Sequence, residues 1–208
     1  MSAEPRDETH GVLGEEPAGA TPREHEELVD LIPDFVATRA DLNLVEYENI
    51  VAALPWADTR ARRGGVEEVL SYQFLLQLHR RMFGDVWKWA GAQRRRGTNI
   101  GVDPSQITTL TKHALDDAVW WHDNKTFHSD ELAARVHHRL VAIHPFPNGN
   151  GRCTRLVADL YLRAIGRDQF TWGNDGLETG GATRTAYLSA LRAADGDDLA
   201  PLLAFARS

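Results

Sequence analysis

The first 27 residues are rich in Glu, Pro, Gly, Thr and Ala and contain few large apolar side chains. A segment that buries so little apolar surface cannot offset its ordering entropy, so residues 1–27 are predicted to be a disordered tail. Apolar residues become frequent from residue 28 onward. Thr38 and Asp41 are candidate N-caps for a helix with apolar residues at helical spacing, which is predicted to end at Pro55.

Two glycines at positions 64–65 interrupt the pattern, which resumes as an amphipathic stripe from Val66 to Met82. Apolar residues recur there at spacings of three and four, which predicts one long helix that ends at Gly84. Similar stripes predict further helices near the C-terminal side. These cover about 103–124, 129–143, 151–166, 183–194 and 197–206.

Residues 93–102 depart from helical periodicity. They contain three consecutive arginines, Gly97 and Gly101, a composition that predicts a short β-hairpin or extended flap. The expected fold class is therefore mostly α, a helical bundle with a short β-hairpin flap. We divide the ordered chain into an N-terminal helical extension over 28–65 and a main domain with the C-terminal helices over 66–208.

Composition narrows the class of protein. At 208 residues, with 42% hydrophobic and 25% charged residues, the chain suits one globular domain with a small appendage. A net charge of −7 gives no general attraction for nucleic acid or anionic membranes, and neither is expected as a partner. The single Cys153 excludes an internal disulfide framework, and no apolar run approaches the length of a membrane span. A cytoplasmic protein is expected.

Candidate chemistry is concentrated in twelve residues that begin at His144 and read His-Pro-Phe-Pro-Asn-Gly-Asn-Gly-Arg-Cys-Thr-Arg. Gly149 and Gly151 let backbone N–H groups approach a ligand, and the helix that begins there directs its positive dipole end to the same place. These features predict an anion site, most naturally for phosphate. Arg152 and Arg155 can flank the anion, and His144 is a candidate general base.

Each of these residues also has a purely structural explanation. A histidine at a helix end is usually structural, Arg155 can pair with Asp159 one turn later, and Arg152 can be a solvated surface charge. The turn is not a P-loop, because no Lys-Ser/Thr follows it. The coincidence of all these features within twelve residues favours a site.

Other candidate sites are weaker. The nine histidines show no metal-binding spacing, and His137 and His138 point to different helix faces, so no histidine metal site is expected. The arginines at 94–96 are weak evidence for nucleic acid in an acidic chain. A flap edge that meets a target or a phosphate is the better functional interpretation, with plain solvation as the alternative.

The twelve-residue stretch resembles the signature of the Fic family, written HPFx(D/E)GNGRxxR, and keeps all but one of its defined positions. Trp87-Lys88-Trp89-Ala90-Gly91 and Asn99-Ile100-Gly101-Val102 resemble the family's residues before and within its flap. The resemblance covers about residues 66–166, with a looser likeness from about residue 28. The whole chain is similar to the bacterial subgroup called mobile mystery protein B.

The resemblance implies a Fic-type bundle that binds ATP and transfers its AMP moiety to a Ser, Thr or Tyr hydroxyl of a target protein. His144 would deprotonate that hydroxyl, and Phe146 would anchor the loop in the core. The residues implied in nucleotide binding are Asn148, Gly149, Asn150, Gly151, Arg152 and Arg155. The flap residues implied in docking the target backbone as an added strand are Thr98, Asn99, Ile100 and Gly101.

Asn148 is the departure from the family pattern, which has Asp or Glu there as a ligand of the Mg²⁺ that bridges the phosphates. An amide oxygen is a weaker ligand than a carboxylate, so we expect Mg²⁺ or Mn²⁺ to be retained with weakened use. The alternatives are a catalytically weak nucleotide-binding regulator and a Fic-type transferase of another phosphate-containing group. The related Doc-type phosphotransferases lack the Gly-Asn-Gly-Arg sequence kept here.

The family's inhibitory helix, Ser/Thr-x-x-x-Glu-Gly/Asn, has no full match in this chain. The segment from Thr38 to Asn43 keeps both end residues but has Leu42 where Glu belongs, and Asp41 comes one residue early. Three alternatives follow. Inhibition is absent, another carboxylate provides it, or a separate small antitoxin-like partner does, in which case this chain is a toxin component.

Overall fold

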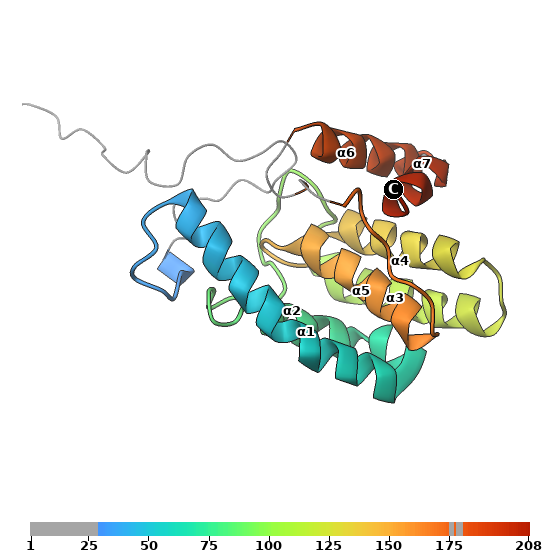
Figure 1. Ribbon diagram of the computed structural model, residues 1–208, viewed down its shortest axis with the longest axis horizontal. Coiled ribbons are helices and arrows are strands. Elements are labelled where there is room, and N and C mark those ends of the chain that lie inside the picture. The colour runs from blue at the N-terminus through green and yellow to red at the C-terminus, as the bar shows by residue number, and fades with distance from the viewer. Residues whose placement is uncertain (1–28, 175–176, 178–180) are drawn as a thin grey trace, which may run out of the picture.

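Helices make up most of the computed structural model, which describes residues 29–174, 177 and 181–208 (Figure 1). The mostly α fold class is confirmed, whereas the predicted tail over 1–27 lies outside the described residues. The elements are α1 (Arg39–Val69), α2 (Tyr72–Phe83), a 3-10 turn η3 (Pro104–Gln106), α3 (Ile107–Asp123), α4 (Ser129–Ile143), α5 (Asn150–Ala164), α6 (Ala182–Asp195) and α7 (Ala200–Ala206). Within the described ranges, no helix is both long and apolar enough to cross a membrane.

Helix α1 begins where predicted and ends later than predicted. Thr38 caps it by accepting from the Asp41 N–H, and the Asp41 carboxylate accepts from the Thr38 N–H in return. The predicted end at Pro55 is wrong, because Pro55 lies inside the helix. Proline removes one helical hydrogen bond, but Pro55 is on the exposed side, where water can satisfy the carbonyl left over. Burial of Ala53 and Ala57 on the opposite side outweighs that loss.

The junction between α1 and α2 also differs from the prediction of one helix from Val66 to Met82. The expected break appears as a kink at Gly65, where φ is +65°, but helical structure resumes and α1 continues to Val69. A second helix then begins because the Ser71 hydroxyl caps it, accepting from the Phe74 N–H at 3.1 Å. Helix α1 therefore crosses the predicted domain boundary at residue 65.

Helix α5 lies at the centre of the bundle, packed against α1, α2 and α4, with α3 beyond α4 (Figure 1). The helices predicted from Gly84 onward are present, with ends close to those expected. The C-terminal pair α6 and α7 packs over α4 and α5. Asp159 of α5 connects the chain before this pair to the core, since its carboxylate accepts from the Phe170 N–H and the Trp172 indole N–H, each at 3.1 Å.

The predicted β-hairpin is not formed. Over the described residues the structure contains only one isolated β-bridge, between Leu31 and Trp87, and residues 93–102 form bends and irregular backbone. Instead of pairing its own two arms, the flap donates backbone hydrogen bonds to the chain around the motif. The Arg94 N–H donates to the Pro145 carbonyl at 3.0 Å, and the Val102 N–H donates to the Ile143 carbonyl at 3.2 Å.

Candidate active site

His144 sits at the sharp turn that ends α4. Pro145 follows it and disfavours a helical conformation at His144, which adopts the left-handed region with φ of +56°. Its backbone N–H still donates to the Leu140 carbonyl at 3.1 Å, so the turn is anchored to the helix. The imidazole Nδ1 lies 3.3 Å from the Val141 carbonyl. A carbonyl only accepts, so Nδ1 carries the proton and the basic lone pair is on Nε2.

The environment of His144 keeps its imidazole neutral. The residue is 5% exposed, and burial lowers its pKa to about 4, with the charge of Arg94 acting in the same direction. The bond to the Val141 carbonyl partly opposes this shift. A neutral imidazole with a protonated Nδ1 has the form of a general base.

Gly149 starts helix α5, and its geometry requires glycine. Its φ is +75°, and a Cβ at this position would lie 2.6 Å from two ring atoms of Phe83. As the N-cap it provides no side chain to satisfy the first N–H groups of α5. The positive end of the helix dipole at this point is suited to an anion.

Asn150 shapes the loop with its side chain. Its Oδ1 accepts from the Phe146 N–H at 2.9 Å, and its Nδ2 donates to the Phe146 carbonyl at 2.8 Å. The oxygen and the nitrogen of the side-chain amide therefore both close the loop. The backbone of Asn150 is the part left to bind a phosphate. Phe146 is fully buried, as expected for an anchor.

Asn148 folds back onto the loop. Its Oδ1 accepts from the Gly149 N–H at 2.7 Å, so the side-chain oxygen points to the start of α5. That position suits an oxygen ligand of a divalent cation bound to phosphates. The described residues contain no group of three or more His, Cys, Asp or Glu side chains that could hold a metal by themselves. Among the motif side chains, the amide oxygen of Asn148 is the predicted metal ligand, and it is a weaker ligand than a carboxylate.

His79 of α2 supports this loop, and the sequence reasoning missed it. The Gly91 N–H donates to its Nδ1 at 3.0 Å, so Nε2 carries the proton and donates to the Asn148 carbonyl at 3.0 Å. Its ring stacks on Phe146, with 3.7 Å between centroids. Complete burial lowers the pKa of His79 to about 3, so it stays neutral.

Arg152 projects from the first turn of α5 toward α1, where it meets a carboxylate that was also missed. Its Nη1 lies 2.7 Å from Oε2 of Glu46, and its guanidinium lies over the Phe83 ring. Glu46 is 1% exposed, and its other oxygen accepts from the Trp87 indole N–H at 2.7 Å. Glu46 thus places a buried carboxylate on one of the two motif arginines.

Arg155 lies over Gly151 and against helix α6. A Cβ at Gly151 would be 3.5 Å from Nη1 of Arg155 and 3.7 Å from the Tyr187 hydroxyl. The guanidinium is 5.5 Å from the centre of the Tyr187 ring, and that hydroxyl is 3.0 Å from Nε2 of buried His137. The C-terminal helices therefore contribute to the surroundings of the motif.

Arg94 connects the flap to the His144 turn. Its Nε donates to the His144 carbonyl at 2.6 Å, and its Nη2 donates to the carbonyls of Ile143 and Val102. The side chain of Arg94 is therefore buried. The prediction that it is solvated or faces a target or phosphate is wrong for Arg94. Gly101 completes the junction, because a Cβ there would lie 2.6 Å from the His144 Cβ.

Of the predicted flap residues, Gly101 lies beside the candidate base. Gly101 contacts His144 directly, whereas Asn99 and Ile100 are exposed and Thr98 is half-buried. The Thr98 hydroxyl donates to the Ile100 carbonyl within the flap. The exposed edge next to His144 is therefore accessible to another chain.

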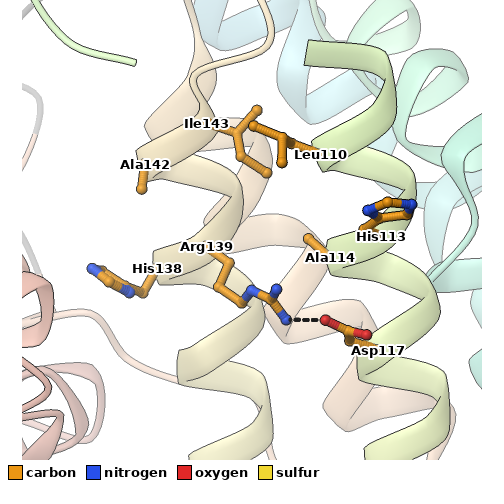
Figure 2. Close-up of a pocket in the computed structure, with 8 residues that line it drawn as sticks. All are labelled: Leu110, His113, Ala114, Asp117, His138, Arg139, Ala142 and Ile143. Carbon is orange, nitrogen blue, oxygen red and sulfur yellow. Dashed lines mark hydrogen bonds and ion pairs between the residues drawn. The ribbon is translucent and has the colours of Figure 1, made fainter. Parts of the chain in front are cut away.

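An open groove of about 390 Å³ lies between α3 and α4 (Figure 2). An ion pair between Arg139 and Asp117, 2.8 Å apart, crosses it. The lining residues are Leu110, His113, Ala114, Asp117, His138, Arg139, Ala142 and Ile143. The groove borders the motif but contains none of the predicted phosphate-binding residues.

The chain matches the model of the Fic/DOC family over residues 69–162. It is 32% identical to protein adenylyltransferase Fic of Aedes aegypti over 107 residues, which are 48% of this chain and 21% of that protein. It is 30% identical to protein adenylyltransferase fic-1 of Caenorhabditis elegans over 143 residues, 65% of this chain and 26% of that protein. The chain thus spans about a fifth to a quarter of the length of these curated relatives.

Among solved structures, the BepC protein of Bartonella tribocorum with bound AMPPNP superposes with a TM-score of 0.64 at 18% identity. The match covers 88% of this chain and 97% of that chain, and at this identity it shows a shared fold. The family match includes α2, the flap, α3, α4 and most of α5, which are the elements that hold His144 and the two motif arginines. Residues 69–162 of this chain are thus similar to the Fic/DOC family, in sequence and in fold.

Proposed function

We propose that this chain is a protein adenylyltransferase, which transfers AMP from ATP to a Ser, Thr or Tyr hydroxyl of a target protein. The observation that carries the proposal is a neutral His144 five residues before Gly149, the N-cap of α5, which has no side-chain cap. A base and an anion site that adjoin each other are what attack on a phosphate requires. The similarity to curated protein adenylyltransferases supports the same reaction.

The reaction balances with the residues present. The acceptor hydroxyl oxygen forms a bond to the α-phosphorus of ATP, and its proton moves to Nε2 of His144. The bond between the α-phosphorus and the oxygen bridging to the β-phosphate breaks, and pyrophosphate leaves with that bond's electron pair. His144 then releases its proton to water or to the product.

The remaining predicted residues bind and orient the nucleotide. The backbone N–H groups of Asn150 and Gly151 would donate to the α- and β-phosphates, and that of Gly149 would join them by exchanging the Asn148 side-chain oxygen for a phosphate oxygen. Arg152 and Arg155 would neutralise the β- and γ-phosphates. Mg²⁺ or Mn²⁺, when bound with the nucleotide, would neutralise further charge, with Asn148 as its weak protein ligand. The flap over residues 98–101 would dock the target backbone beside His144.

The direct test is transfer of label from α-labelled ATP to proteins of a cell lysate, with Mg²⁺ or Mn²⁺. The proposal predicts labelled protein bands with the natural chain and none with His144→Ala, while both variants bind nucleotide. The matched control is His113→Gln, because His113 is an exposed histidine on α3, whereas His137 is buried. This variant should label target proteins as the natural chain does. Equal labelling by the natural chain and His144→Ala would refute the role of His144.

A second candidate function is a catalytically weak nucleotide-binding regulator, favoured specifically by Asn148 in place of a carboxylate. In that case nucleotide binds at the motif, but no protein is labelled under any metal condition. A Fic-type transferase of another phosphate-containing group would leave the lysate unlabelled with α-labelled ATP, yet modify proteins when given a different nucleotide. Mass spectrometry of the modified proteins separates these outcomes.

We further propose that the protein acts in the cytoplasm as a toxin-type module held in check by a small antitoxin-like partner. The support is the resemblance to the mobile mystery protein B subgroup and the free, buried thiol of Cys153, which suits a reducing compartment. Expression of the natural chain should then slow bacterial growth more than expression of His144→Ala does. Equal growth of the two strains would contradict a toxin role.

A further inference from the structure

The segment that leads into the flap has a charge opposite to that of the protein as a whole. Residues 71–102, which include α2 and the flap, contain six basic side chains and one acidic one. The net charge of this segment is therefore +5, within a chain whose net charge is −7. Positive charge is thus concentrated on the part of the chain that reaches the His144 turn, and the remainder is strongly acidic.

Arg95 is the member of this segment that the fold leaves without a contact. Five of the six basic side chains are exposed, namely Arg80, Arg81, Lys88, Arg95 and Arg96. The Arg95 side chain makes no hydrogen bond or ion pair within the part of the chain that the structure describes. Solvated arginines are common on protein surfaces and by themselves indicate no partner. The location of Arg95 is what distinguishes it.

Arg95 lies at the base of the flap, where the flap joins the His144 turn. The residue before it, Arg94, donates from its backbone N–H to the Pro145 carbonyl at 3.0 Å and from its side chain to the His144 carbonyl at 2.6 Å. Consecutive Cα atoms are about 3.8 Å apart, so the backbone of Arg95 is one residue away from these contacts. The buried Arg94 anchors the flap, and the exposed Arg95 presents a cation beside the candidate base.

Arg80 adds a second cation where the chain enters the flap. A Cβ at Gly91 would lie 2.7 Å from the Arg80 Cβ, so the chain passes directly over α2 at this residue, four positions before Arg95. The acidic residue that follows the flap, Asp103, acts through its charge on the buried Arg94. Two exposed cations therefore face solvent at the start of the flap.

We propose that Arg95 selects target proteins that carry an acidic side chain within about four residues of the acceptor hydroxyl. The inference rests on the proposed adenylyltransferase function, because it concerns the target segment that is docked beside His144. An extended segment rises about 3.3 Å per residue, so a carboxylate a few residues from the acceptor reaches the base of the flap. The planar guanidinium matches a carboxylate with two parallel hydrogen bonds, and the pair would fix the register of the target segment.

A short acidic segment suits this surface better than a nucleic acid does. A polyanion that extended beyond the flap would meet the strongly acidic remainder of the chain and would be repelled there. A few carboxylates next to the acceptor meet only the base of the flap. The phosphates of ATP are anions as well, but the proposed reaction assigns them to Arg152 and Arg155 of α5.

The first test is to locate the modified hydroxyls in a lysate treated with the full chain and ATP. Mass spectrometry should find Asp or Glu within about four residues of the modified hydroxyl more often than around unmodified hydroxyls of the same proteins. Arg95→Glu should modify fewer of these sites and gain sites flanked by Lys or Arg. Equal frequencies of acidic residues around modified and unmodified hydroxyls would overturn the inference.

The second test uses two peptides copied from one mapped site, with its acidic residues either kept or replaced by their amides. With the acidic peptide, Arg95→Gln should raise the KM for the peptide about fivefold, as one exposed ion pair allows, and leave kcat and the KM for ATP unchanged. With the amide peptide, Arg95→Gln and the natural chain should have equal KM values. Arg63→Gln is the matched control, because Arg63 is exposed near the far end of α1, and it should behave as the natural chain with both peptides.

Each remaining outcome has a definite meaning. An unchanged KM for the acidic peptide in Arg95→Gln would overturn the inference, and a raised KM for ATP would assign Arg95 to the nucleotide. Peptides left unmodified while lysate proteins are labelled would overturn it too, because recognition would then need a folded surface. A fluorescent single-stranded oligonucleotide that binds the natural chain but not Arg95→Gln would assign the surface to nucleic acid.

Failure of the proposed function gives a different result. In that case the natural chain transfers no label from α-labelled ATP to any lysate protein, and the inference about Arg95 falls with the reaction. Labelled proteins without acidic residues near their modified hydroxyls would leave the reaction standing and overturn the inference alone.

Discussion

At the scale of single residues, the site depends on how the fold treats its ionisable and polar side chains. His144 is a candidate base because burial and a carbonyl partner keep its ring neutral with the lone pair on Nε2. Asn150, which the motif suggests as a phosphate ligand, uses its side chain to close the loop. The same stretch of sequence therefore contains residues that we propose to act on a ligand and side chains that shape the loop.

His144 should remain neutral well below the pH at which a histidine ordinarily titrates. Its folded-state pKa is lowered from 6.5 to about 4, so its neutral form persists as pH falls from 6.5 toward 4. By linkage, this lowered pKa makes its contribution to stability fall over the same window as pH decreases. A ring-nitrogen NMR titration of the free protein measures both the pKa and the protonated nitrogen. A midpoint near 6.5 would contradict the buried, neutral base.

Asn148→Asp should increase metal-dependent activity. A carboxylate binds Mg²⁺ more tightly than an amide oxygen, and a gain of about 1.4 kcal/mol corresponds to about a tenfold faster label transfer. The metal concentration that gives half-maximal activity should fall as well. Asn148→Ala serves as the control, because it removes the ligand without adding a charge and should lower activity. If the Asp and Ala variants behave alike, the metal does not contact this position.

At the scale of elements, the flap over residues 93–102 is anchored by the buried side chain of Arg94. The expected pairing of two strands within the flap is not formed. Arg94 satisfies carbonyls of the flap and of the His144 turn at once, so the two segments take their positions together. Gly101 permits their close approach.

Arg94→Gln should therefore disturb both stability and catalysis. The shorter neutral amide cannot reach these carbonyls, and the loss of buried hydrogen bonds to a charged group should cost about 2–4 kcal/mol of unfolding free energy. Urea denaturation measures this loss, and label transfer should fall with it. Arg95→Gln is the matched control for stability, because Arg95 is exposed and its variant should be near neutral in unfolding free energy. Equal stability of the two variants would mean that Arg94 does not anchor the flap.

Helix α1 contributes to the site through Glu46. Its buried carboxylate is paired with Arg152 and would compete with a nucleotide phosphate for that guanidinium. Glu46→Gln removes the charge but keeps an oxygen for the Trp87 indole N–H, so nucleotide should bind several-fold more tightly, on the order of 1 kcal/mol. Calorimetric titration with a non-hydrolysable ATP analogue measures the change. Glu48→Gln, exposed on the same helix, should bind as the natural chain does, and weaker binding by Glu46→Gln would show that Glu46 orients Arg152 instead.

At the scale of the whole molecule, helices with N-caps and clear apolar stripes were predictable from the sequence. Features that depend on packing between distant segments were not. The stripe through Leu75, Leu78 and Met82 identified the buried face of α2, and His79 falls on that face, which was an available signal for a structural histidine. Glu46 interrupts the buried face of α1 in the same way, between Leu42 and Asn49.

Other features had no local signal. Pro55 stays inside α1 because alanines on the opposite side pack against the core, which depends on distant segments. The role of Arg94 depends on carbonyls about 50 positions away, and its exposed neighbours have the same side chain. The contact of Arg155 with Tyr187 joins α5 and α6 at positions 32 residues apart, across a long connection without helical periodicity.

The central claim is that the neutral His144 and the start of α5 direct attack to the α-phosphate of ATP. Parallel reactions with α-labelled and γ-labelled ATP test it most directly, with the same lysate and the same protein. The account predicts that target proteins retain the α label and never the γ label, and that His144→Ala retains neither. Retention of the γ label would contradict it, because the transferred group would then be the terminal phosphate.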